Sequence, residues 1–262
     1  MSGPRHLFSA WGEICGKARP AGRLALLADL DGTLAPIRRR PQQVRLSASV
    51  RARLVKIARS GAVVGVISGR SLADVRRIVG VKGIWYAGAH GLFLQDPGNR
   101  RIALTTLKQR KRMAQVRRAL ERAVQGVPGV WLEDKRASVA VHFRGAPRRS
   151  VVAASARICR LLEKYPGLHL LKGKKVWEVL PEEGLDKAAA IRVILRRERL
   201  HRLGSARLVY YLGDDTTDER VFEKLGGVSI VVGRRRRTAA RYFLRSPAEV
   251  ARFLNRWSEL RR

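Results

Sequence analysis

Short apolar runs alternate with amphipathic segments in the first part of the chain. The runs at 24–28, 62–67 and 84–87 are almost continuously hydrophobic and too short for helices, which predicts strands buried on both faces. Between them, segments 47–60 and 71–80 place apolar residues on one helical face and end at glycines. Strands that alternate with helices predict parallel βαβ units with helices on both faces of one sheet.

The pattern changes after the Asp-Pro-Gly-Asn turn signal at 96–99. Beyond it the sequence predicts helices at 108–125 and 149–164 and strands at 130–132, 138–143, 168–171 and 175–180. The first rhythm then resumes, with predicted elements at 186 onward, 208–212, 217–225, 228–232 and 247–260. We therefore predict an α/β protein. Its doubly wound parallel-sheet core is formed by residues 1–97 and 183–262 and is interrupted by an α+β domain at 98–182.

The composition permits a sizeable core, because 45% of the 262 residues are hydrophobic. No apolar stretch approaches the roughly 18 residues that span a bilayer. Residues 1–10 lack the pattern of a signal peptide. Only Cys15 and Cys159 are present, far apart, so we expect neither a disulfide framework nor a structural zinc site. A cytoplasmic protein that does not enter the membrane is the simplest expectation.

The chain is strongly basic, with 55 Lys and Arg against 21 acidic residues and a net charge of +34. Such a surface favours phosphorylated molecules and polyanions as partners. The cations are nevertheless spread over the predicted helices, and aromatic residues make up only 6%. Without a basic block or an aromatic stacking platform, we do not expect specific nucleic-acid binding.

Two acids, Asp29 and Asp31, follow the apolar run at 24–28. On an extended backbone, residues i and i+2 point the same way, so the strand would present both at its carboxyl end, where open α/β sheets bind ligands. Paired carboxylates repel and need a cation, a shared proton or an electrophile between them. The alternative is a strand-to-turn junction that uses Asp and Gly32 only for turn chemistry.

Three more segments carry candidate chemistry. Ser68, with Arg70 close behind, follows a strand and offers donors to a phosphate, although Ser-Gly-Arg is also an ordinary turn. Lys187 lies at a predicted helix N-terminus, where it would stabilise an anion; alone it would be read as a solvated lysine. The acidic segment 212–219, with Asp214 at a strand end, favours Mg²⁺ over zinc, and Asp215 or Thr217 is a candidate helix cap.

In this order, the four segments resemble the haloacid dehalogenase (HAD)-like hydrolase superfamily, with an inserted α/β cap domain between the second and third. Within it the chain is similar to the trehalose-6-phosphate phosphatase family. The resemblance spans about 24–232 and departs from the family at Ala89, where an Asn is usual. The residues that carry the closer match are Tyr86-Ala87-Gly88-Ala89-His90-Gly91-Leu92, Glu133-Asp134-Lys135, His142-Phe143-Arg144, Gly173-Lys174-Lys175-Val176-Trp177-Glu178 and the segment 212–219.

The resemblance implies a Rossmann-like HAD core and Mg²⁺-dependent hydrolysis of trehalose 6-phosphate to trehalose and phosphate. Asp29 would be the nucleophile that forms an aspartyl phosphate, and Asp31 the general acid and base, which must arrive protonated. Ser68 and Lys187 would hold the phosphoryl oxygens. The metal would be held by Asp29, the Asp31 carbonyl and Asp214, with Asp215 and Asp218 in supporting roles.

The predicted substrate-binding residues are mostly charged, as hydrogen bonds to sugar hydroxyls require. They are Arg70, His90, Glu133, Lys135, Arg144, Lys174 and Glu178. The alternative makes Glu133–Lys135 and Lys174–Glu178 ordinary ion pairs of a sheet and leaves His90 and His142 structural. Rival functions are hydrolysis of another sugar phosphate, such as sucrose phosphate or glycosyl-phosphoglycerate, and binding of a polyanion or nucleic acid by a protein without catalysis. The oligomeric state is left open.

Overall fold

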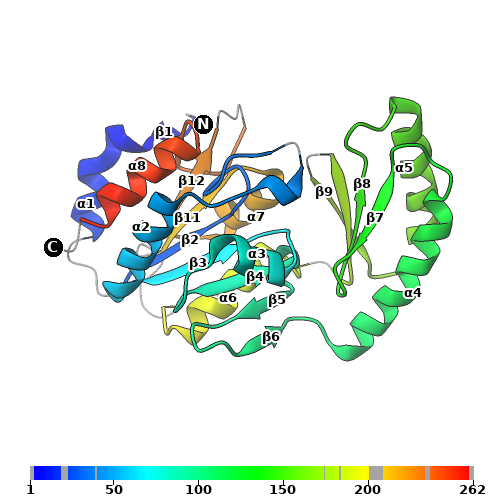
Figure 1. The fold of residues 1–262 in the computed structure, drawn as a ribbon, viewed down its shortest axis with the longest axis horizontal. Coiled ribbons are helices and arrows are strands. Elements are labelled where there is room, and N and C mark those ends of the chain that lie inside the picture. Colours follow the sequence, from blue (N-terminus) through cyan, green and yellow to red (C-terminus); the bar gives the residue numbers. More distant parts are fainter. Residues whose placement is uncertain are drawn as a thin grey trace. The chain divides into compact units, whose positions relative to one another are not determined.

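The computed structural model describes residues 3–18, 23–38, 40–173, 175–182, 184–200, 209–233 and 237–259. Contacts divide the chain into two compact units (Figure 1): a core unit, Met1–Ile102 with Lys187–Arg262, and an inserted unit, Ala103–Asp186. The inserted unit begins later than the predicted boundary at 98, because the chain first adds strand β6 (Arg101–Ala103) to the core sheet. It also ends beyond 182, at the residue before helix α6 (Lys187–Arg197).

One large sheet forms the centre of the core unit. Strands β1, β13, β12, β11, β2, β3 and β4 are parallel neighbours, and β5 runs antiparallel to β4. The doubly wound core predicted from the apolar runs is thus confirmed, with a mixed edge. In sheet order the strands are β1 Arg5–His6, β13 Tyr242–Leu244, β12 Val228–Val232, β11 Val209–Gly213, β2 Ala25–Ala28, β3 Val63–Ile67, β4 Trp85–Gly88, β5 Phe93–Gln95 and β6 Arg101–Ala103.

Helices cover both faces of this sheet, as two adjacent tyrosines of β11 illustrate. Tyr210 packs edge-on against Trp257 of α8, whereas Tyr211 lies against Phe222 of α7 on the other face. The face of Tyr210 also buries apolar residues of α1, α2 and α3, and α6 packs on α7. The bounds are η1 Leu7–Ala10, α1 Trp11–Ala18, η2 Pro41–Gln43, α2 Ala48–Arg59, α3 Leu72–Val79, η3 Ala89–Gly91, α7 Thr216–Lys224 and α8 Pro247–Trp257.

Local sequence signals fix several of these helix ends. The Ser47 hydroxyl accepts from the Val50 amide at the start of α2, and Ser71 does the same for Asp74 in α3. Gly80 ends α3 in the left-handed region, with φ at 60°. Asp215, rather than Thr217, is the N-cap of α7. No helix among the described residues combines the length and apolar character needed to cross a bilayer.

The strand order places a switch point at the middle of the sheet. From β2 the chain proceeds through β3 and β4 on one side, and later returns through β11, β12 and β13 on the other. Ligands of open α/β sheets bind outside the carboxyl ends of the strands at such a point. Here those ends belong to β2 and β11, which deliver Asp29 and Asp214.

The inserted unit has an antiparallel sheet in the order β7-β8-β10-β9, with α4 (Leu107–Val124) and α5 (Arg148–Glu163) on one face (Figure 1). Leu120, Ile158 and Val141 are buried together in the core between helices and sheet. The strands are β7 Trp131–Asp134, β8 Val139–His142, β9 His169–Gly173 and β10 Val176–Leu180. Among the described residues of this unit, no helix covers the opposite face of the sheet.

Candidate active site

Asp29 follows strand β2 directly, and its backbone amide donates to the Leu212 carbonyl oxygen of β11 at 2.8 Å. This bond draws the two strand ends together at the switch point. The Asp29 side chain is buried, and its Oδ1 accepts from the Lys187 Nζ at 2.8 Å. A buried carboxylate with a charged partner is thus present at the sheet edge where the sequence predicted a nucleophile.

Lys187 is the first residue of α6, as predicted, but it is not a solvated lysine. Its side chain is 3% exposed, and Nζ contacts Asp29 and Asp218 Oδ1 at 2.8 Å each. Burial lowers the pKa of Lys187, but Asp218 and Asp29 outweigh burial and raise it well above its ordinary value. The ammonium therefore stays charged at any physiological pH.

Asp218 projects from the first turn of α7 and is completely buried. Besides Lys187, its Oδ1 accepts from the Tyr211 hydroxyl at 2.6 Å, and its Oδ2 accepts from the Asp215 amide at 2.9 Å. Three donors on two oxygens suit a carboxylate that holds its neighbours in place. Tyr211 was not among the predicted site residues; the available signal was a pair of tyrosines in an otherwise apolar strand, just before Gly213.

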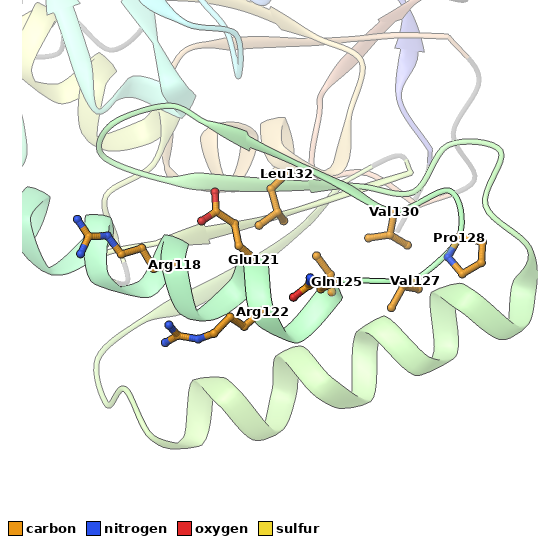
Figure 2. A pocket seen from close by; sticks show the side chains of 10 residues that line it. Arg118, Glu121, Arg122, Gln125, Val127, Pro128, Val130 and Leu132 are labelled. Carbon is orange, nitrogen blue, oxygen red and sulfur yellow. The ribbon is translucent and has the colours of Figure 1, made fainter.

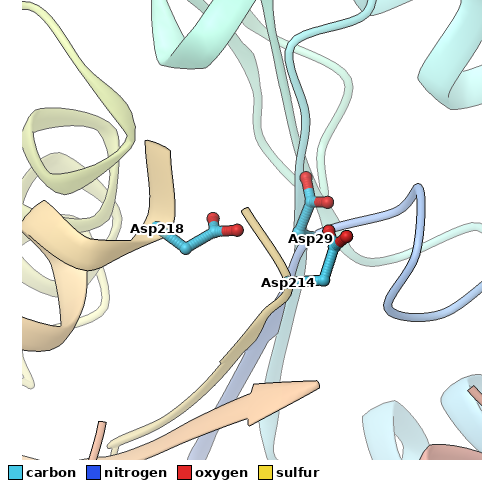
Figure 3. Close-up of side chains that lie close together, drawn as sticks. All are labelled: Asp29, Asp214 and Asp218. Atoms are coloured by element: carbon cyan, nitrogen blue, oxygen red, sulfur yellow. The ribbon is translucent and has the colours of Figure 1, made fainter. Parts of the chain in front are cut away.

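Asp29, Asp214 and Asp218 together form a group of buried carboxylates (Figure 3), with one oxygen of each within 4.8 Å of the others. The Asp214 carboxylate can pack against Gly32 only because that residue has no side chain: a Cβ there would lie 2.3 Å from Asp214 Oδ2. Gly32 also has φ at +80°, which disfavours any side chain. The turn after β2 therefore wraps closely around the second acid.

The electrostatics of this group favour a cation. Burial raises the pKa of Asp29, Lys187 lowers it, and Asp218 and Asp214 raise it again, so that the pKa of Asp29 lies well above its ordinary value. Burial and Asp218 likewise raise the pKa of the Tyr211 phenol, which stays a hydrogen-bond donor. Carboxylate oxygens are the donors that Mg²⁺ prefers. Asp29 and Asp214 fit such an ion, whereas Asp218 is already engaged by three donors.

Asp31 departs from its predicted arrangement. Strand β2 ends at Ala28 and residues 30–34 form a turn, so the alternation of an extended strand does not carry from Asp29 to Asp31. The Asp31 carboxylate instead accepts two hydrogen bonds from Arg70, Nε to Oδ2 at 2.6 Å and Nη2 to Oδ1 at 2.7 Å. In the structure, each of the two acids contacts a basic side chain, Lys187 for Asp29 and Arg70 for Asp31. The Arg70 guanidinium, which was expected to bind a phosphate, is hydrogen-bonded to Asp31 in the structure.

The turn after β3 brings Ser68 and His90 together. Ser68 is buried, its amide donates to the Ala87 carbonyl oxygen, and its carbonyl oxygen accepts from the His90 amide. The His90 ring lies over Gly69, where a Cβ would come within 2.6 Å of two ring atoms. Ala89 and His90 have φ values of 49° and 54°. The unusual backbone at Ala89 explains why an Asn, which tolerates the left-handed region, would fit the same position.

The inserted unit holds the remaining candidates. Lys135 Nζ donates to Glu178 Oε2 at 2.7 Å, both side chains being buried, and Ser138 also donates to Glu178. Glu133 pairs with His142 at 2.8 Å. Among the described residues, Lys135 thus forms an ion pair with Glu178, and Glu133 is hydrogen-bonded to His142. Arg144 is exposed in the turn after β8, and Lys174 lies outside the described residues.

A hollow of about 830 Å³ also opens on the inserted unit, between the end of α4 and the start of β7 (Figure 2). It lies on the helix side of the sheet, as Val130 and Leu132 are packed against the core between sheet and helices. None of the predicted site residues lines it. Its lining is Arg118, Glu121, Arg122, Val124, Gln125, Gly126, Val127, Pro128, Val130 and Leu132.

Comparison with known proteins identifies the family. Residues 27–248 match the family model described as Trehalose-phosphatase. The chain belongs to the trehalose-phosphatase family. Members of the trehalose-phosphatase family are phosphoric monoester hydrolases, and the resemblance noted in the sequence is thereby confirmed.

Two similar members of the trehalose-phosphatase family are mycobacterial. The trehalose-phosphate phosphatase of Mycobacterium ulcerans is 36% identical over 271 residues, which cover 97% of this chain and 67% of the relative. That of Mycobacterium tuberculosis H37Rv is 39% identical over 246 residues, covering 88% and 60%. The chain thus spans about 60 to 67% of the length of these relatives.

Solved structures agree on the fold. Trehalose-6-phosphate phosphatase of Aspergillus fumigatus superposes with a TM-score of 0.71 at 26% identity, covering 98% of this chain and 99% of that chain. The C-terminal domain of the C. albicans enzyme gives 0.80 at 21% identity, with 98% of both chains covered. A haloacid dehalogenase-like hydrolase from Bacteroides thetaiotaomicron gives 0.68 at 15%, with 90% of this chain and 100% of that chain covered. The last two show the fold alone, which is that of the HAD-like hydrolases.

Proposed function

We propose that this protein hydrolyses trehalose 6-phosphate to trehalose and phosphate. The observation that carries the proposal is the buried group of Asp29, Lys187 and Asp214 at the switch point, in a chain of the trehalose-phosphatase family. A buried carboxylate beside a fixed ammonium suits attack on a phosphoester, because the cation also neutralises charge on the phosphoryl oxygens.

In the proposed reaction, an oxygen of Asp29 attacks phosphorus and the bond from phosphorus to the sugar oxygen breaks. The departing sugar oxygen takes a proton from Asp31. Water then attacks the aspartyl phosphate, gives its proton to Asp31, and releases phosphate and free Asp29. Ser68 and Lys187 hold the equatorial oxygens meanwhile. Mg²⁺ bound by Asp29, the Asp31 carbonyl and Asp214 would supply charge neutralisation and polarise phosphorus.

The contact between Arg70 and Asp31 adds a step to this scheme. Asp31 must be protonated and released from the guanidinium before it can donate to the sugar oxygen. A phosphate group binds an arginine fork as well as a carboxylate does. We therefore expect the arriving phosphoester to take over the Arg70 fork that Asp31 occupies in the free protein.

Sugar recognition is proposed for the charged residues of the inserted unit, Glu133, Lys135, Arg144, Lys174 and Glu178, together with His90. Lys135 and Glu178 are paired and buried, which supports a preorganised pair for sugar hydroxyls. A reducing compartment such as the cytoplasm is proposed as the location of the protein, because Cys15 and Cys159 are far apart in the sequence and do not suggest a disulfide framework.

The test is phosphate release from a panel of trehalose 6-phosphate, sucrose 6-phosphate and glucosyl-3-phosphoglycerate, with Mg²⁺ or with EDTA. We expect kcat/KM for trehalose 6-phosphate to exceed the others by about a hundredfold, and EDTA to abolish it. A similar margin in favour of another sugar phosphate would reject the substrate. Asp29→Asn should abolish turnover, whereas the matched control Asp96→Asn, in the turn between β5 and β6, should not.

A further inference from the structure

Trp131 is an unusual exposed residue of the inserted unit. Four large hydrophobic side chains among the described residues are markedly exposed, and Trp131, at 52%, is the only aromatic one of them. An exposed indole offers a large, rigid apolar surface, and Trp is enriched at binding interfaces for that reason. Trp131 begins β7, an edge strand, and its side chain lies on the sheet face opposite the helices.

The Trp131 indole is stacked on the imidazole of its cross-strand neighbour, His142. Trp131 and His142 are partners in the β7–β8 register, and their rings are stacked with centroids 4.0 Å apart and planes 12° apart. His142 is itself fixed, because its Nε2 is 2.8 Å from Glu133 Oε2. The three side chains form one preorganised unit on a regular strand pair, which reduces the entropy that a ligand would have to remove.

Glu133 adds a directed polar group beside this aromatic surface. It lies two residues from Trp131 on the same face of β7. The hydrogen bond from His142 lowers the pKa of Glu133 despite partial burial, so the group is a carboxylate at neutral pH. Within the described part of the chain, its Oε1 has no hydrogen-bond partner. The surface thus offers the apolar face of the Trp131 indole and, two residues along β7, the Glu133 carboxylate as a hydrogen-bond acceptor.

The exposed Trp131 ring and the nearby Glu133 carboxylate together favour some ring-shaped ligands over others. A nucleotide would stack on the indole but would bring phosphates towards the Glu133 carboxylate, which repels them. A neutral pyranose has C–H bonds on one face that pack against the indole and hydroxyl groups at its rim that donate to a carboxylate. The site therefore matches a sugar ring rather than a base or a polyanion.

We propose that Trp131, stacked on His142, is the platform for a pyranose ring of the substrate, with Glu133 Oε1 accepting a hydrogen bond from a ring hydroxyl. The proposal rests on the proposed function, since it assigns part of the sugar that the phosphatase recognises. It assigns substrate selectivity to Trp131, a residue that takes no part in the chemistry at phosphorus.

The experiment compares Trp131→Ala, Trp131→Phe and a control, Leu107→Ala, whose side chain is 62% exposed in the same unit. Steady-state kinetics are measured with trehalose 6-phosphate and with glycerol 2-phosphate, which has no ring. Inhibition of glycerol 2-phosphate hydrolysis by free trehalose is measured as well. Thermal melts confirm that each variant is folded.

For Trp131→Ala we expect KM for trehalose 6-phosphate and Ki for trehalose to rise roughly tenfold, with little change in kcat. Values for glycerol 2-phosphate should stay the same. Trp131→Phe should retain both affinities within about threefold, and Leu107→Ala should resemble the wild type. Equal effects on both substrates, or no effect of Trp131→Ala on either sugar constant, would overturn the proposal.

Failure of the proposed function gives a different pattern. A wild-type enzyme that prefers another sugar phosphate rejects trehalose 6-phosphate as substrate, and the same Trp131 comparison with the preferred sugar phosphate then decides the platform. A wild-type enzyme that prefers glycerol 2-phosphate to every pyranose phosphate overturns both.

Discussion

Replacement of Lys187 by Met tests the electrostatic reasoning about the candidate active site. Met has a similar length but no charge, so Lys187→Met leaves Asp29 and Asp218 buried without their common cation. The side chains of the two acids are 7% and 0% exposed, so water cannot take over that role. Removal of one partner from a buried ion pair costs about 3–5 kcal/mol.

For a protein of this size, that loss lowers the melting temperature by roughly 6–20 °C. The effect should also depend on pH. Burial and the neighbouring acids already raise the pKa of Asp29, and loss of the opposing Lys187 charge raises it further. The folded variant then binds more protons than the unfolded chain, so its stability increases as pH falls. The deficit should be largest near pH 7.5 and smaller near pH 5.

The assay is thermal unfolding by circular dichroism in EDTA at both pH values, with phosphate release measured in parallel with Mg²⁺. Lys82→Met, at an exposed lysine, is the control and should change neither quantity. A melting temperature of Lys187→Met within about 2 °C of wild type near pH 7.5 would refute the view that Lys187 stabilises the fold by its buried ion pairs with Asp29 and Asp218. A deficit that is the same at both pH values would refute the link to the buried carboxylates.

Four further variants address other parts of the molecule. Asp214→Asn removes a like charge, so it should raise the melting temperature in EDTA, and fluorimetry should show that it loses the stabilisation by Mg²⁺, about 2.7 kcal/mol for the wild type at a hundred times Kd. Gly32→Ala places a Cβ 2.3 Å from Asp214 Oδ2 at a φ of +80°. If Asp214 binds Mg²⁺ as proposed, a titration of activity against Mg²⁺ should show activation weakened by roughly tenfold or more. Arg136→Gly relieves a φ of 68° on an exposed turn. The relief of about 1–2 kcal/mol outweighs the extra entropy of a glycine in the unfolded chain, about 0.4–1 kcal/mol, so the free energy of unfolding in urea should rise by about 0.5–1 kcal/mol. Burial opposes ionisation of Glu249, but hydrogen bonds from a backbone amide and a histidine lower its pKa below the ordinary value of 4.5. The ionised Glu249 therefore stabilises the fold above pH 4.5, and this stabilisation should be lost as the pH drops below that value. In Glu249→Gln the free energy of unfolding should decrease less steeply over the same pH range.

Much of the fold was predictable because buried parallel strands are written as uninterrupted apolar runs. The central strands β2, β3, β4, β11 and β12 all coincide with such runs, and Ser47, Ser71 and Gly80 marked helix ends correctly. The short strands β1, β5, β6 and β13 were missed, since two or three residues carry no measurable period. Their place in the sheet comes from neighbours that are distant in sequence.

The site was predictable in its members more than in its pairings. A strand end followed by an acid is visible in the sequence, which is why Asp29 and Asp214 were identified. The partner of each charge depends on three-dimensional placement instead. The turn that begins after Ala28 sends Asp31 to Arg70, and the register of β7, β8 and β10 pairs Glu133 with His142 and Lys135 with Glu178.

The chain returns from the inserted unit to the core unit between Asp186 and Lys187. The residue at which it re-enters is therefore the same one whose ammonium joins Asp29 to Asp218. A displacement of the connecting segment would be transmitted through a single peptide bond to the cation of the acid group. Insertions or crosslinks in that connection would thus alter catalysis without replacing any residue of the candidate active site. In this architecture, changes in the segment that connects the two units can therefore affect the position of the Lys187 ammonium.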